Sequence, residues 1–112
     1  VREIPWNDAH TSHATREDAR ENLRMAWVGY KRVIEEPLGF TGLIVTRPDW
    51  DRCGGGECSE VMDTIMPCGC VLQTVGAHYL GQKIAKACDI KFLDEKNEFQ
   101  HVWMLVLLSC LP

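Results

Sequence analysis

A stripe of apolar residues at steps of three and four predicts one long amphipathic helix over residues 15–36. Thr15 can cap the free amides of the first turn, and the acidic residues that follow it suit the positive end of the helix dipole. The helix should end before Pro37, because a residue that precedes proline is disfavoured in helical geometry. The stripe consists of Ala19, Leu23, Trp27, Tyr30 and Ile34.

The middle of the chain carries two further stretches with helical spacing. The first predicts a helix of two turns from Ser59 to Met66, which Pro67 ends. The second predicts a helix from about Thr74 to Cys88 with one apolar face, beside which His78 is interpreted as a histidine packed at the edge of the core. The apolar positions are Val61, Met62, Ile65 and Met66 in the first helix, and Ala77, Leu80, Ile84 and Cys88 in the second.

Three other segments have the composition of strands. Residues 43–46 form a short β-branched run after a glycine turn. Residues 90–93 and 99–108 predict a β-hairpin with a charged tip, and apolar residues on both faces beyond Val102 predict that its second strand is central in a sheet.

These elements predict the α+β class, in the order helix, strand, helix, helix, hairpin, with a small and mainly antiparallel sheet covered by helices. A chain of 112 residues is the size of a single domain, so residues 1–112 are expected to form one. Residues 1–14 show no clear period and are predicted to be an extended N-terminal arm.

Composition limits the classes of partner that the protein is expected to bind. Hydrophobic residues make up 46% and charged residues 25% of the chain, an ordinary balance for a globular protein. The net charge of −4 argues against a nucleic-acid partner, since phosphate binding favours clustered basic surface. The longest apolar run, Val102 to Leu108, is far shorter than the ~18 residues of a membrane-spanning helix. A protein or a small molecule of unknown identity remains as the expected partner.

The stretch from Cys53 to Cys70 holds four of the six cysteines. An even number of cysteines can pair as disulfides in an oxidising compartment, and a start at Val1 is compatible with a processed, secreted protein. Alternatively, two pairs of thiolates could hold a tetrahedral zinc ion, the one cofactor that the sequence suggests. The third possibility is six free thiols. The candidate metal ligands are Cys53, Cys58, Cys68 and Cys70.

One cysteine is also a candidate nucleophile. Cys58 lies between a glycine loop and the first turn of a predicted helix, where backbone amides favour a thiolate. His101 lies at the head of a predicted strand and is followed by Val102 and Trp103. Over about residues 54–106, this order resembles the transglutaminase and papain-like thiol enzymes. The resemblance implies that Cys58 is the nucleophile and His101 the general base.

Three functions therefore stay open. The first is a small cysteine-stapled binding or interaction domain, such as a secreted effector or a toxin-like protein. The second is a thiol-dependent acyl-transfer or hydrolytic enzyme that uses Cys58 and His101. The third is a structural zinc-binding module, so the sequence leaves open whether the protein is an enzyme.

Overall fold

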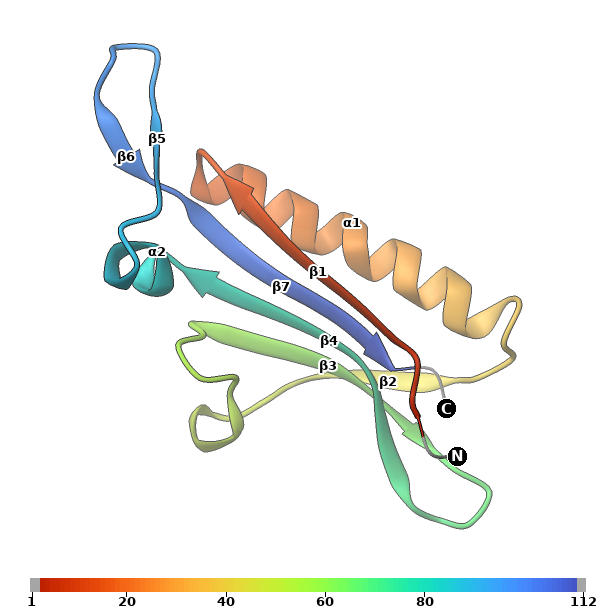
Figure 1. The fold of residues 1–112 in the computed structure, drawn as a ribbon. Helices are drawn as coiled ribbons and strands as arrows, with labels where there is room; N and C mark the ends of the chain where they lie inside the picture. The colour runs from red at the N-terminus through yellow and green to blue at the C-terminus, as the bar shows by residue number, and fades with distance from the viewer. Residues whose placement is uncertain (1–2, 111–112) are drawn as a thin grey trace.

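The computed structural model describes residues 3–110, which form a five-stranded antiparallel sheet with one long helix on one face (Figure 1). The strand order in the sheet is β1-β7-β4-β3-β2, and β5 and β6 form a separate two-stranded hairpin. The elements in chain order are β1 (Trp6–His13), α1 (Arg16–Glu35), β2 (Gly42–Thr46), the 3-10 helix η1 (Asp49–Asp51), β3 (Cys58–Ile65), β4 (Val71–Gly81), α2 (Lys83–Ala87), β5 (Lys91–Leu93), β6 (Phe99–His101) and β7 (Trp103–Cys110).

The predicted first helix is present as α1. The Thr15 side chain accepts a hydrogen bond from the Asp18 amide at 3.1 Å, which satisfies one free donor of the first turn. Three residues of the apolar stripe are buried, namely Ala19, Trp27 and Ile34. They pack onto the sheet, where Met62, Val75 and Leu105 complete the centre of the core. No helix within residues 3–110 combines the length and the hydropathy needed to cross a membrane.

Most of the segment that was predicted to be an extended N-terminal arm, residues 1–14, is a strand of the sheet. Residues 6–13 are the edge strand β1, which pairs with β7 from Trp6–Cys110 to His13–Trp103. The alternation of polar and small residues in this strand follows from its position, because only one face of β1 lies against α1. β7 is consequently held between β1 and β4.

Both helices predicted in the middle of the chain are wrong. Residues 58–65 are the strand β3, and residues 71–81 are the strand β4, with helical structure only in the short α2 that follows. Every residue from Thr74 to Gly81 is buried, so β4 lacks the alternation that marks a half-buried strand. In β3 the consecutive residues Val61 and Met62 are both buried, and the register with β4 shifts after Met62. Strands buried on both faces therefore imitated helical spacing.

The predicted hairpin is confirmed, as is the central position in the sheet of the strand that follows Val102. β5 pairs with β6 over Lys91–His101 to Leu93–Phe99, and the chain then continues into β7 between β1 and β4 (Figure 1). The predicted fold, a small sheet covered by several helices, is thus replaced by a mostly antiparallel sheet with one long helix and one short one. That the chain forms a single domain stays a prediction.

Candidate functional site

The face of the sheet turned away from α1 carries a row of polar residues that run across four strands. Strand pairing places His10, Val106, His78 and Ser59 directly opposite one another on β1, β7, β4 and β3. Residues opposite one another in paired strands share a face, so these side chains lie together. The ion pair between His10 and Asp8, at 3.2 Å, is exposed on the same strand edge.

The neighbouring row is centred on Gly76, over which three side chains converge. A methyl group at Gly76 would lie 3.0 Å from His78 Nε2, 3.0 Å from Leu108 Cδ1 and 3.2 Å from Gln73 Nε2. Contacts this short show that the side chains use the space that glycine leaves free. We refer to Gln73, Gly76, His78 and Leu108 as the Gly76 cluster.

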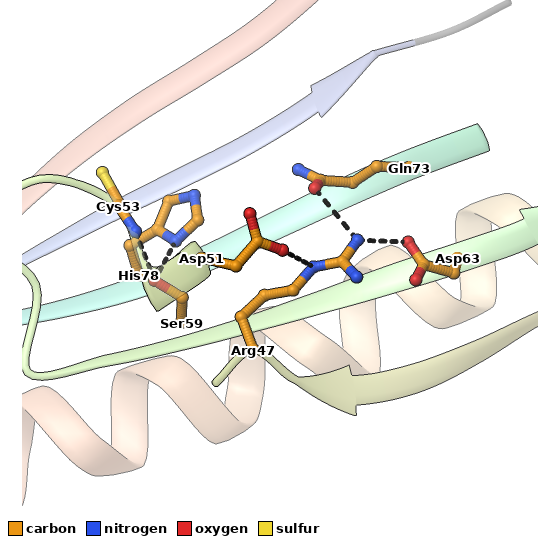
Figure 2. A network of polar contacts seen from close by, with 7 residues as sticks. All are labelled: Arg47, Asp51, Cys53, Ser59, Asp63, Gln73 and His78. Atoms are coloured by element: carbon orange, nitrogen blue, oxygen red, sulfur yellow. Dashed lines mark hydrogen bonds and ion pairs between the residues drawn. The ribbon is translucent and has the colours of Figure 1, made fainter. Parts of the chain in front are cut away.

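His78 is held by the loop between β2 and β3. The Ser59 hydroxyl accepts a hydrogen bond from the Cys53 amide at 3.0 Å and lies 2.9 Å from His78 Nδ1 (Figure 2). Because Ser59 is fully buried, its own hydrogen is best donated to Nδ1, which places the imidazole hydrogen on Nε2. Burial lowers the pKa of His78, so the ring is neutral at pH 7.

Gln73 is oriented by Arg47, which lies between two carboxylates. Arg47 Nη2 donates to Asp63 at 2.7 Å and Arg47 Nε lies 3.6 Å from Asp51 (Figure 2). The same guanidinium approaches Gln73 Oε1 at 3.5 Å, which directs the amide nitrogen of Gln73 toward Gly76. Gln73 reaches this face because the register shift opposite Met62 leaves Thr74 without a strand partner.

The cluster therefore presents two N–H donors over one glycine. The Nε2 atom of His78 makes no hydrogen bond to the described residues, and Gln73 is exposed. Neutral donors in this arrangement bind and orient an oxygen acceptor such as a carbonyl or a phosphoryl oxygen. This face is our candidate functional site.

A second concave surface has a different character. A groove of about 420 Å³ runs between α1 and the sheet and is lined mainly by apolar side chains, with Asn7 and Ser109 as its polar residues. It contains no ionisable cluster, so it offers packing surface but no chemistry. We do not assign a ligand to it.

The predicted catalytic pair, Cys58 and His101, lies in two different sheets. Cys58 is in β3 opposite Tyr79, and His101 is in β6 opposite Lys91, with its Nε2 atom 3.5 Å from Asp89. Burial, followed by the charge of Glu60, raises the pKa of Cys58. A raised pKa opposes the formation of a thiolate. The opposite is expected from the sequence, because Cys58 lies at the start of a predicted helix.

The four predicted zinc ligands are separated by the length of β3. Cys53 and Cys58 precede or begin this strand, whereas Cys68 and Cys70 belong to the turn after it, roughly 25 Å away for a strand of this length. All six cysteines are free. Within residues 3–110, no group of three or more metal-ligating side chains is assembled. The disulfide and zinc interpretations of the cysteine stretch are therefore wrong.

The sequence interpretation missed Arg47, Gln73 and Gly76, and it assigned His78 to a helix. The available signal was a glycine after the β-branched pair Thr74-Val75, which is typical of a strand where another group approaches the backbone.

Comparisons with known proteins give a consistent result. The family described as tRNA synthetase class II core domain (G, H, P, S and T) matches residues 1–108. The proline–tRNA ligase of Thermofilum pendens is 42% identical over 102 residues, which are 91% of this chain and 21% of that protein. The corresponding ligase of Nanoarchaeum equitans is 43% identical over 93 residues, or 83% of this chain and 17% of that protein.

Solved structures show the same similarity. Giardia lamblia prolyl-tRNA synthetase in complex with prolyl-adenylate superposes with a TM-score of 0.91 at 42% identity, over 98% of this chain and 22% of that one. The Cryptosporidium parvum enzyme complexed with L-proline and AMP gives a TM-score of 0.88 at 25% identity, over 98% and 24% of the two chains. This chain thus spans about a fifth of the length of the relatives that it matches.

These matches overturn the functions expected from the cysteines. A secreted, cysteine-stapled effector and a transglutaminase-like or papain-like thiol enzyme are both wrong, because sequence and fold match tRNA synthetases instead. The preference for a secreted protein fails with them, since it depended on cysteines that prove to be free.

Proposed function

We propose, from the premise that this chain belongs to the family of class II tRNA synthetase core domains, that it forms part of the catalytic core of a prolyl-tRNA synthetase. The ligand would be prolyl-adenylate, bound on the sheet face that carries the Gly76 cluster. The observation that carries the proposal is the TM-score of 0.91 with an enzyme solved in complex with that compound.

The chemistry of the cluster supports this ligand. An aminoacyl-adenylate presents a carbonyl oxygen and phosphoryl oxygens, which are acceptors and match the N–H groups of Gln73 and His78. Both donors are held before any ligand binds, His78 by Ser59 and Gln73 by Arg47. Donors that are fixed in advance need little reorganisation when charge develops on the acceptor.

The proposed enzyme would also have a tRNA partner, which conflicts with the expectation of no nucleic acid. That expectation rested on the net charge of −4. Net charge averages over the chain and does not describe one face, and this chain spans only about a fifth of its relatives. The charge argument therefore has no force for the whole protein.

The test is proline-dependent exchange between ATP and pyrophosphate, measured on the complete protein that carries this chain. Replacing Gln73 by Leu should lower kcat/KM for proline by about tenfold, which is the effect of losing one hydrogen bond to an oxygen atom that carries or develops negative charge. Gln100→Leu is the matched control, since Gln100 is an exposed glutamine on the β5–β6 hairpin that bonds Asp94 at 3.2 Å. Absence of proline-dependent exchange in the unmodified protein would refute the proposal, and equal activities of the two variants would remove Gln73 from the site.

A further inference from the structure

Two arginines lie over two aromatic rings on the α1 side of the sheet. The Arg16 Cζ atom lies 5.9 Å from the centre of the Trp103 ring, and the Arg20 Cζ atom lies 5.9 Å from the centre of the Tyr79 ring. The two rings stack, with centroids 6.3 Å apart and planes 17° apart. Arg16 and Arg20 are one helical turn apart on α1, so their guanidinium groups are neighbours.

Neither of these arginines forms an ion pair with another residue in the described part of the chain. Two acids close to them in sequence have other partners, since Asp18 pairs with His13 at 2.8 Å and Glu21 pairs with Arg24. Arg24 and Arg32, on the same helix, do have carboxylate partners. Arg16 and Arg20 are thus two adjacent positive charges that form no ion pair within residues 3–110.

The hydroxyl group of Tyr79 is the independent second observation. Tyr79 is 4% exposed, and its buried oxygen has no hydrogen-bond partner among residues 3–110. Burial, and then the charge of Glu57, raises the pKa of Tyr79, whereas the nearby Arg16 and Arg20 lower it. A guanidinium can only donate, so the hydroxyl hydrogen of Tyr79 has no acceptor. Among the described residues, no acceptor lies within hydrogen-bond distance of this hydroxyl.

We propose that Arg16, Arg20 and Tyr79 form a binding site for the oxyanion of a phosphate group. Two guanidinium groups can each donate to phosphate oxygens in a bidentate manner, and their combined charge matches a phosphate dianion. The Tyr79 hydroxyl would supply a third donor from the buried side. The stacked rings of Tyr79 and Trp103 hold the two arginines in place through cation–π contacts.

This site is separate from the Gly76 cluster. Tyr79 and His78 are consecutive residues of β4, so their side chains project from opposite faces of the sheet. The inference therefore does not depend on the proposed function, and a variant at Arg20 or Tyr79 leaves Gln73 and His78 unchanged.

The test is a titration of the complete protein with inorganic phosphate at constant ionic strength, with chloride as the balancing anion. The rise of Tm with phosphate concentration gives an apparent Kd. We expect this Kd to increase about tenfold or more in Arg20→Gln and in Tyr79→Phe. Arg24→Gln, which removes an exposed and ion-paired arginine of the same helix, should bind phosphate as the unmodified protein does. Equal phosphate dependence in all four proteins would overturn the proposal.

Tyr79→Phe gives a second measurement that does not need a ligand. In phosphate-free buffer, this variant should have a Tm equal to or higher than that of the unmodified protein, because it removes a buried hydroxyl without a partner and keeps the ring. A lower Tm would mean that the hydroxyl already has an acceptor within the protein, and the site would be refuted.

The source of the phosphate is identified by competition. A short single-stranded RNA that displaces inorganic phosphate in the unmodified protein, and binds less tightly to Arg20→Gln, assigns the site to a nucleic-acid backbone. If the RNA does not compete, the site takes free phosphate or a phosphate monoester. Either result supports the site, provided that the Arg20→Gln variant has lost it.

Discussion

His78 and Tyr79 are consecutive residues of β4, but they differ in hydrogen bonding: the His78 ring has a partner for Nδ1, and the Tyr79 hydroxyl has none among the described residues. His78 lies beside Ser59 of β3, whose hydroxyl group also accepts from the Cys53 amide in the loop before that strand. Tyr79 lies on the face covered by α1, and its hydroxyl has no partner. A loop can place backbone amides and short polar side chains at chosen points, whereas a helix covers a sheet with apolar side chains and long cations. The two faces of the sheet are consequently suited to different tasks.

The largest effect should come from the α1 face. Leu105 is fully buried in the core between α1 and the sheet, so Leu105→Ala should lower the free energy of unfolding by about 2–5 kcal/mol. Leu108, which is only partly buried on the opposite face, is the control. Urea denaturation compares the two variants. If Leu108→Ala were as costly, the two faces would be packed equally well.

A smaller effect is expected on the face with the Gly76 cluster. Arg47→Met leaves the Asp63 carboxylate, which is 19% exposed, without its partner, and should cost about 1–3 kcal/mol of unfolding free energy. The double variant with Asp63→Asn should recover part of that loss, because it removes the unpaired charge. Purely additive losses in the double-mutant cycle would show that the pair does not hold this face together.

The smallest effect concerns the pH dependence of stability. Burial lowers the pKa of His78 below its ordinary value of 6.5, so the unfolded chain binds a proton more readily than the folded one. The contribution of a neutral His78 is fully present above pH 6.5 and is lost as the pH falls through the folded value. Unfolding free energies at pH 7.5 and 5.5 should therefore differ less in His78→Gln than in the unmodified protein. An unchanged difference would mean that the imidazole is not held neutral.

The sequence was informative where one side of an element faces water. The apolar stripe and the Thr15 cap located α1 within a residue or two of its observed ends. In β3 and β4 the same method failed, since strands that are buried on both faces have no period of two. The β-branched residues Thr74 and Val75 favour a strand, but the apolar steps of three and four from Ala77 to Cys88 are typical of a helix and led to the wrong prediction.

The candidate site was less predictable than the fold. The number of cysteines suggested a site in the stretch from Cys53 to Cys70. In the structure, two of its cysteines lie near the start of β3 and the other two lie beyond its end. The Gly76 cluster instead depends on a register shift at Thr74 and on pairing between strands far apart in sequence. No spacing in the sequence records these contacts. Only the three-dimensional arrangement brings Arg47, Gln73 and His78 together.

The pairing of β1 with β7 has a consequence for how the chain is made. Among the described strands β1 comes first in the chain and β7 last, and they pair along their full length, from Trp6–Cys110 to His13–Trp103 (Figure 1). During synthesis β1 therefore cannot pair with β7 until the residues between them have been made. Closing so long a loop is entropically unfavourable and slows folding. Its polar sequence, with Asn7, Asp8, His10 and Ser12, keeps the waiting strand soluble and guards against premature association with other nascent chains.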